Sequence, residues 1–249
     1  MPDIPLGWRP AAGCLAGKIV LVTGACDDIG AAVARACASH GATVVLLDRD
    51  VRALEEIYDD IVRAGGPQPA AVPLDLAAAD VANVDAVAEM IEKEFGRLDG
   101  VVFCAQTLGA LTPLDQYKPA TWATVVHANL NVPFLLAQAL LPLLRRAPEA
   151  SMIFTTADVA RAPRAYWGAY GATLAAVENL AATLGQELES NTRIRVHTLD
   201  PGAIRTRLRA QAYPAEDRSK LRSAADAANA YLYLLGLDSC RQPNSAWTG

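Results

Sequence analysis

The segment TGACDDIG, residues 23–30, carries the strongest structural signal in the sequence. It follows an apolar, β-branched run at Ile19–Thr23 and opens a helical pattern at Ile29–His40. Glycines at a strand-to-helix turn let the backbone approach a pyrophosphate at the helix N-terminus. The spacing alone is a weak signal, but its place after the first strand of a βαβ unit strengthens it. We therefore expect a dinucleotide-binding turn that includes Gly24, Ile29 and Gly30.

Outward from this turn, short apolar runs alternate with longer helical patterns. The further strands are expected at Thr43–Leu47, Ala70–Leu74, Val101–Cys104, Met152–Thr155 and Arg195–Leu199, and the further helices at Val51–Ala64, Val81–Phe95, Thr121–Leu144, Trp167–Glu189 and Ala224–Leu235. Repeated strand-then-helix units require a parallel sheet. The sequence predicts a single-domain α/β protein, a Rossmann-type doubly wound parallel sheet with helices on both faces and ligands at the carboxyl ends of the strands.

One domain is expected to span residues 1–249, with an N-terminal extension at 1–17 and a candidate substrate lid at 206–222. The net charge is −5, from 22 basic and 27 acidic residues, and no Lys/Arg-rich tract favours a nucleic-acid partner. The five cysteines form no CxxC pair and the three histidines are scattered, so we expect reduced thiols, a cytoplasmic protein and no metal site.

The stretch Ala120–Leu144 contains no Asp, Glu, Lys or Arg, so a membrane span is one interpretation of it. Histidine, asparagine, glutamine and two prolines interrupt the stretch, however. A helix buried against a sheet or a subunit partner is therefore favoured, and no membrane association is expected.

An acidic residue, Asp48, ends the second predicted strand. A carboxylate at this place accepts hydrogen bonds from the adenosine ribose 2′-hydroxyl and repels a 2′-phosphate, which would select NAD over NADP. The alternative is that Asp48 caps the following helix, a role that Asp50 fills equally well.

From Lys18 to Trp247 the chain resembles the short-chain dehydrogenase/reductase family, most of all its YciK-like bacterial branch. The residues that carry the resemblance are TGACDDIG, Phe154-Thr155-Thr156 and Tyr166-Trp167-Gly168-Ala169-Tyr170. The resemblance implies a nicotinamide dinucleotide as cofactor and a carbonyl or alcohol as substrate. It also implies cofactor contacts at Asp75, Leu76, Pro201, Gly202 and Thr206.

The family's catalytic residues are Asn, Ser, Tyr and Lys. Asn129 matches the Asn and Tyr170 matches the Tyr, which exchanges the substrate proton. The Lys position, one helical turn after the tyrosine, is Leu174, and the Ser position is Ala157. A tyrosine without a cationic neighbour titrates near its reference pKa of about 10, so only about one molecule in a thousand holds a phenolate at neutral pH.

Two further departures concern the cofactor. The family's NNAG after the fourth strand is Phe-Cys-Ala-Gln at residues 103–106, and the middle glycine of the first turn is Asp28. A carboxylate about 4 Å from a phosphate charge costs on the order of 1–4 kcal/mol. Asp27 and Asp28 also suit the role of helix caps. We expect Asp28, Ala157 and Leu174 to lie at the cleft rather than in the core.

Our leading hypothesis is a family scaffold with an eroded catalytic site, with hydride transfer very weak or absent, weak NAD binding, and a role in binding or as an oligomer partner. The alternative is an active NAD(H)-dependent alcohol or ketone oxidoreductase in which Tyr170 has nonstandard support. A third hypothesis is a subunit of a mixed oligomer with a homologous active partner. A homodimer or tetramer would form through Thr121–Leu144 and Trp167–Glu189, whose alanines (Ala169, Ala172, Ala175, Ala176 and Ala181) suit close helix packing.

Overall fold

The computed structural model describes residue 4, residues 8–236 and residues 245–248. In this part of the chain, strands form one parallel sheet of seven in the order β3-β2-β1-β4-β5-β6-β7. Their bounds are β1 Ile19–Thr23, β2 Thr43–Asp48, β3 Ala70–Pro73, β4 Gly100–Phe103, β5 Ala150–Thr155, β6 Ile194–Asp200 and β7 Ser245–Thr248. The order reverses direction between β1 and β4, and such a switch point opens a crevice at the carboxyl ends of the strands.

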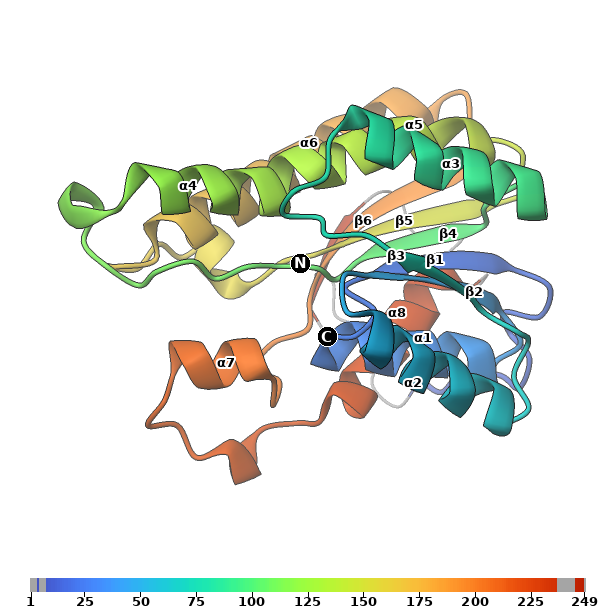
Figure 1. Cartoon of the computed structure of the whole chain (residues 1–249), viewed down its shortest axis with the longest axis horizontal. Helices are drawn as coiled ribbons and strands as arrows, with labels where there is room; N and C mark the ends of the chain where they lie inside the picture. Colours follow the sequence, from blue (N-terminus) through green and yellow to red (C-terminus); the bar gives the residue numbers. More distant parts are fainter. Residues whose placement is uncertain (1–3, 5–7, 237–244, 249) are drawn as a thin grey trace.

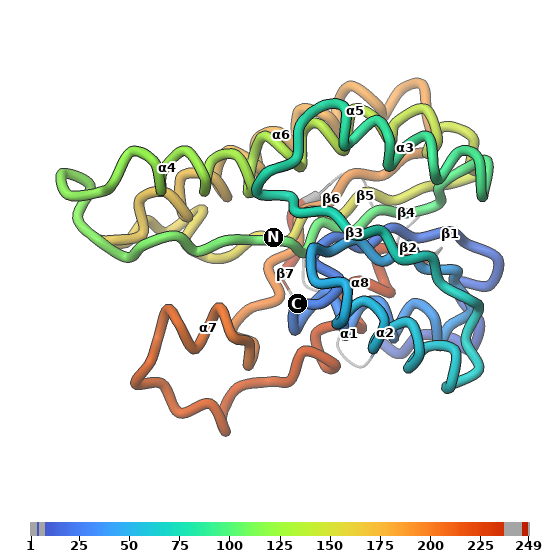
Figure 2. The backbone as a smooth tube through the Cα atoms, in the orientation of Figure 1, coloured from blue at the N-terminus to red at the C-terminus, as the bar shows by residue number. Residues whose placement is uncertain are grey.

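Helices cover both faces of this sheet (Figure 1). One face carries α1 (Asp28–Ser39), α2 (Val51–Arg63) and α8 (Ala224–Leu235), and the other carries α3 (Val81–Phe95), α4 (Pro119–Val126), α5 (Val132–Leu144) and α6 (Gly168–Glu189). Figure 2 shows that α7 (Arg207–Ala212) stands apart from both layers. It lies on the segment between β6 and α8, residues 201–223, which is called the α7 segment below. The predicted doubly wound α/β fold is confirmed.

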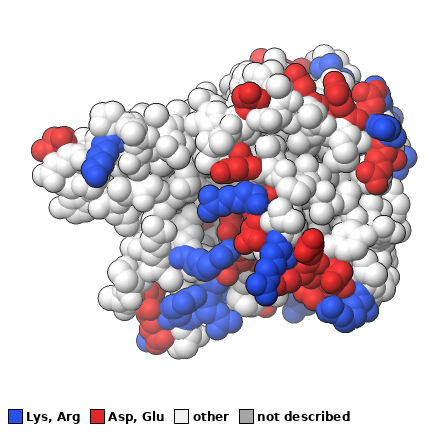
Figure 3. Space-filling view, viewed as in Figure 1, with Lys and Arg blue, Asp and Glu red and all other residues white. Residues whose placement is uncertain are grey.

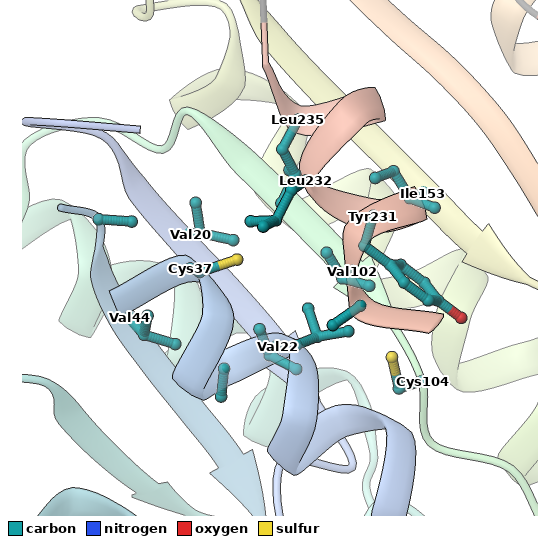
Figure 4. Packing of buried hydrophobic residues seen from close by; sticks show 14 of the residues in the cluster. Val20, Val22, Cys37, Val44, Val102, Cys104, Ile153, Tyr231, Leu232 and Leu235 are labelled. Atoms are coloured by element: carbon teal, nitrogen blue, oxygen red, sulfur yellow. The ribbon is translucent and has the colours of Figure 1, made fainter. Parts of the chain in front are cut away.

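Two apolar clusters, one on each face, hold the sheet between the helices. Along β1, Val20 and Val22 belong to the cluster under α1 and α8, while Leu21 between them belongs to the cluster under α3 and α5. This alternation is the two-residue period of a strand whose two faces are both buried. Figure 4 shows the first cluster, in which Leu232 of α8 lies over the strands and Tyr231 points toward Cys104.

Two elements differ most from the sequence-based expectation. The strand β7 was not predicted; it is four residues long and its Trp247 is buried. The long apolar helix begins at Pro119 rather than Thr121, and a π-helical turn at His127–Asn131 divides it into α4 and α5. Residues 1–3 and 5–7 of the expected N-terminal extension lie outside the described residues. In the described part of this extension, the ring of Trp8 packs edge-on against the ring of Tyr233 of α8, with 5.2 Å between the ring centroids.

The segment Pro119–Leu144 is the one stretch of the described chain that is long and apolar enough to cross a membrane by length and composition. In the fold it packs against α3 and α6, and Val132, Leu136 and Leu140 belong to the buried cluster on that face. It is a core helix of the domain.

Candidate cofactor and catalytic site

Two adjoining cavities open at the carboxyl ends of the strands. The first, about 290 Å³, lies between the first turn, the start of α6 and the α7 segment. The second, about 320 Å³, lies at the ends of β2 and β3. Asp27, Gln106 and Thr107 line both cavities. An elongated ligand that filled both would therefore pass between the first turn and the β4 loop.

The first turn keeps the two glycines that its own backbone requires. Gly24 has φ +64°, and a Cβ on it would lie 2.8 Å from the backbone of Ala105. A Cβ on Gly30 would lie 2.0 Å from the carbonyl oxygen of Gly24, so this position admits no side chain. Gly24 and Ile29 line the cavities, whereas Gly30 packs beneath the turn.

Asp28 is the first residue of α1, and its carboxylate binds the α7 segment rather than capping α1. Its Oδ2 accepts a hydrogen bond from the backbone N–H of Arg207 at 2.8 Å and lies 3.6 Å from Nε of that arginine. The Arg207 Nη2 also donates to the carbonyl oxygen of Cys26 at 3.1 Å and to Asp27 Oδ1 at 3.0 Å. Asp27 stands at the N-cap position without a side-chain cap bond, so the capping interpretation of these two acids is wrong.

At the end of β2, the side chain of Asp48 accepts hydrogen bonds from backbone N–H groups. Its carboxylate accepts from the N–H of Cys26 at 2.9 Å and from the N–H of Arg49 at 2.7 Å. The helix cap of α2 is Asp50, which accepts from Ala53 N at 3.1 Å. Arg49 is exposed and lines the second cavity beside Asp48. Arg49 was not among the predicted cofactor contacts, although the sequence places this basic residue directly after the acidic strand end.

The other residues expected to contact a cofactor divide between the two cavities. Asp75 and Leu76 line the second cavity, and Pro201, Gly202 and Thr206 line the first. The Thr206 hydroxyl accepts from Arg209 N at 3.0 Å, which caps α7. The expected residues therefore lie around the two adjoining cavities, which together are called the groove below.

Tyr170 lies in the first cavity but is 4% exposed. Its hydroxyl donates to Oε1 of Gln106 at 2.5 Å, and Nε2 of that glutamine donates to the carbonyl oxygen of Thr155 at 2.7 Å. Burial raises the Tyr170 pKa well above its ordinary value, and the carboxylates of Asp200 and Asp158 raise it further. The tyrosine is therefore neutral, and its proton is directed at Gln106, a partner that was not predicted from the sequence.

Leu174 packs in the interior beneath Tyr170 and is 1% exposed, in a cluster with Leu108 and Val159. The expectation that it lies at the cleft is wrong, because its apolar side chain is buried with this cluster. Ala157, in contrast, does line the first cavity.

The family resemblance implies a serine hydroxyl at position 157, and neither of the two preceding residues, Thr155 and Thr156, replaces it. Thr155 bonds Tyr231 at 3.0 Å inside the core, and Thr156 donates to Glu178 at 2.7 Å. Both hydroxyls are thus engaged away from Tyr170.

Asn129 is 3% exposed in the π-helical turn. Its Oδ1 accepts from Thr107 N at 2.8 Å and its Nδ2 donates to Thr107 O at 2.9 Å. This pair of bonds fixes the loop after β4, which is a structural task, and Asn129 does not line either cavity.

The arginines around the first cavity are paired with acids. Arg161 bonds Glu178 and also Asp200, and Arg209 bonds both oxygens of Glu216 at 2.6 and 2.7 Å. Figure 3 shows basic and acidic side chains interleaved around the α7 side of the molecule. Directly before Trp167, which lines the first cavity, Tyr166 has φ +75°, a conformation that costs a non-glycine residue energy.

Comparisons with known proteins match this architecture. A family model described as short chain dehydrogenase matches residues 18–217. The uncharacterized oxidoreductase YciK of Escherichia coli is 40% identical over 235 residues, covering 94% of this chain and 92% of YciK. A short chain dehydrogenase structure from Pseudomonas syringae superposes with a TM-score of 0.95 at 44% identity, covering 98% of each chain.

A further structure, from Shigella flexneri, is a short chain dehydrogenase complexed with NADP; it has a TM-score of 0.92 and 39% identity, and covers 96% of this chain and 99% of its own. The matched residues include the first turn, both cavities and the Tyr170 region. The chain therefore belongs to the short-chain dehydrogenase family of oxidoreductases.

Proposed function

We propose that this protein binds NADP(H) and is a poor hydride-transfer catalyst, whose residual activity favours carbonyl reduction over alcohol oxidation. The observation that carries the proposal is the surroundings of Tyr170. Leu174 stands where the family places a lysine, and the tyrosine hydroxyl donates to Gln106. The charges that act on Tyr170 are carboxylates, which oppose its ionisation.

The groove fits a dinucleotide, and Arg49 favours the phosphorylated form. Arg49 lines the second cavity, whereas the Asp48 carboxylate accepts hydrogen bonds from the backbone N–H groups of Cys26, Arg49 and Asp50. A guanidinium at this end suits a 2′-phosphate, because charge-assisted hydrogen bonds to phosphate are among the strongest in proteins. Relatives from Shigella flexneri and Escherichia coli were crystallised with NADP and NADPH. NADP(H) therefore replaces the NAD expected from Asp48 alone.

The two reaction directions make different demands on Tyr170. A bound NADPH supplies hydride to a carbonyl carbon, and the protein must then deliver one proton to the carbonyl oxygen. A neutral Tyr170 carries that proton, but its hydroxyl must leave Gln106 to donate it. Oxidation needs the phenolate as base, and burial raises the pKa so that this form is scarce at neutral pH. Reduction is therefore the easier direction, and both are slow.

Calorimetric titration with NADPH and with NADH tests the cofactor half of the proposal. We expect saturable NADPH binding, at least tenfold tighter than NADH, a ratio that corresponds to about 1.4 kcal/mol. Equal affinities would remove the role given to Arg49. Binding of neither cofactor at millimolar concentration would contradict the proposed function.

Association with a second subunit, of this chain or of a homologous active protein, remains a second proposal. Trp122 of α4 is 38% exposed and Phe134 of α5 is 45% exposed, which favours a covered face there. On α6, Ala172 and Ala175 are exposed, whereas Ala169 and Ala181 pack into their own domain. Sedimentation at several concentrations tests self-association, and a monomer throughout would contradict it.

We also propose a small carbonyl or alcohol as substrate, the class of substrate that membership of this oxidoreductase family implies. A cytoplasmic location is our proposal for the compartment, supported by the buried thiols of Cys37 and Cys104. Mass spectrometry of the protein isolated under alkylating conditions tests that compartment: reduced cysteines support it and oxidised pairs contradict it.

A further inference from the structure

A contact between two distant segments of the chain lies across the groove that the proposed function assigns to the cofactor. Asp28 at the start of α1 and Arg207 at the start of α7 are 179 residues apart in sequence, and both line the first cavity. Ile29 and Thr206, which the family resemblance assigns to the cofactor, line the same cavity. The contact therefore lies where the diphosphate of a dinucleotide reaches the first turn.

The guanidinium of Arg207 faces two carboxylates at once. It donates to Asp27 at 3.0 Å and to the carbonyl oxygen of Cys26 at 3.1 Å, and its Nε lies 3.6 Å from Asp28. Burial and the carboxylate of Asp48 raise the pKa of Asp27 above its ordinary value, and the guanidinium of Arg207 opposes this shift. Without Arg207, a phosphate entering here would meet two carboxylates, and the other arginine of α7 at this cavity, Arg209, is bonded to Glu216.

Arg207 can bind an anion without leaving these carboxylates. A guanidinium has five N–H donors in a planar fork, so one edge can face a carboxylate while another faces a phosphate. The side chain is 71% exposed, which leaves room for a second partner. In the same contact, the backbone N–H of Arg207 donates to Asp28, so the position of α7 depends on the first turn.

We propose that Arg207 is a diphosphate-binding residue delivered by the α7 segment, which compensates for Asp28 in place of the absent glycine and couples the order of α7 to cofactor binding. The inference rests on the proposed NADP(H) binding. Asp28 and Arg207 act as a pair: the acid positions the arginine, and the arginine offsets the charge of the acid.

The test is a double-mutant cycle read by NADPH affinity in calorimetry. Arg207→Ala is expected to weaken NADPH binding about tenfold, because two carboxylates then face the diphosphate alone. In the Asp28→Gly background the same substitution is expected to cost only about twofold to threefold, since one of those carboxylates is gone. Arg218→Ala is the matched control: it removes an exposed arginine of the same segment that lines neither cavity, and is expected to change affinity less than twofold.

Hydrogen exchange of the α7 amides gives a second readout that needs no turnover. Asp28→Gly is expected to speed exchange at Arg207, because its N–H loses its acceptor, and NADPH is expected to slow exchange across α7 in the parent. Tighter or unchanged NADPH binding by Arg207→Ala would overturn the proposal, and so would a cost equal in both backgrounds.

If the parent binds no NADPH, the proposed function fails separately. In that case the pair Asp28→Gly and Asp28→Gly/Arg207→Ala still tests Arg207, because the first variant removes the opposing charge. Binding by the single variant that weakens in the double variant supports the role of Arg207, and equal binding by the two contradicts it.

Discussion

The first turn and the surroundings of Tyr170 both differ from the pattern that the family resemblance implies, but the structure accommodates the two differences in different ways. At the turn, a charge replaces a glycine on an open surface, and Arg207 from α7 meets that charge with an ion pair and a backbone hydrogen bond. Near Tyr170, Leu174 replaces a lysine in the interior, and apolar packing fills the space. One long side chain can offset a charge at a solvent-exposed site. In the apolar interior, packing fills the space but supplies no cation near Tyr170.

The largest expected effect tests whether the Tyr170 region can be rebuilt. The triple variant Leu174→Lys/Ala157→Ser/Asp28→Gly is expected to raise the rate of NADPH-dependent ketone reduction about a hundredfold or more over the parent. The gains should be strongly non-additive, because Tyr and Lys act as one unit. Steady-state rates with a panel of ketones measure this. A triple variant that binds NADPH and remains at the parent rate would show that Gln106 or α7 also blocks the reaction.

The same substitution has a cost in stability that the buried position of Leu174 dictates. Leu174→Lys alone is expected to destabilise the fold by on the order of 2–4 kcal/mol, because it places an ammonium among Leu108, Val159 and Tyr170. Leu174→Met, which nearly conserves volume, is the control and should cost less than about 1.5 kcal/mol. Urea unfolding compares them, and equal stability of the two variants would mean that the lysine reaches solvent.

The next effect concerns the second cavity. Arg49→Ala is expected to weaken NADPH binding about tenfold to a hundredfold and to leave NADH binding unchanged, because a charge-assisted hydrogen bond to phosphate contributes about 1.5–3 kcal/mol. Arg52→Ala is the matched control, since Arg52 is an exposed arginine of α2 that pairs with Glu56. Equal losses for both cofactors would assign Arg49 to the shared part of the dinucleotide.

A smaller effect separates the stabilising role of Tyr170 from its chemistry. Tyr170→Phe leaves Oε1 of Gln106 without this donor and is expected to cost about 1 kcal/mol of unfolding free energy at pH 8. The folded pKa of Tyr170 is raised, so its contribution is fully present below the unfolded value of about 10 and declines as pH rises beyond it. The stability gap between parent and variant should therefore narrow between pH 9 and pH 11. A gap that widens there contradicts the sign.

The smallest effect concerns Asp48. Asp48→Asn is expected to change the ratio of NADPH to NADH affinity less than threefold, because the carboxylate is engaged by the N–H groups of Cys26 and Arg49. A loss of stability of about 1 kcal/mol should accompany it, as one acceptor becomes an amide. Paired cofactor titrations measure the ratio, and a shift of tenfold or more would return cofactor choice to Asp48.

Periodicity was sufficient to predict most of the fold, because buried parallel strands and amphipathic helices have distinct repeats. The α8 bounds, Ala224–Leu235, agree with the expectation, whereas β7 was missed because four residues near the chain end carry too little pattern. The site was predictable where a local motif specifies it, as at Gly24, whose backbone approaches Ala105.

Contacts across long sequence separations could not be predicted in this way. The bond from Tyr170 to Gln106 spans 64 positions, and the ion pair from Arg207 to Asp27 spans 180. Each depends on how loops at the sheet edge meet, which no local repeat encodes. The burial of Leu174 was missed for a similar reason, since its neighbours Leu108 and Val159 come from other loops.

The most direct test of the central claim is the rate of NADPH oxidation by the unmodified protein, saturated with NADPH, across a panel of aliphatic and aromatic ketones at pH 7. We expect rates well below the 1 s⁻¹ that marks the lower end of typical enzyme turnover, because Tyr170 has a buried hydroxyl directed at Gln106 and Leu174 in place of a cation. A turnover of about 10 s⁻¹ with any ketone would contradict the account, since Tyr170 would then be an efficient proton donor without the family's lysine.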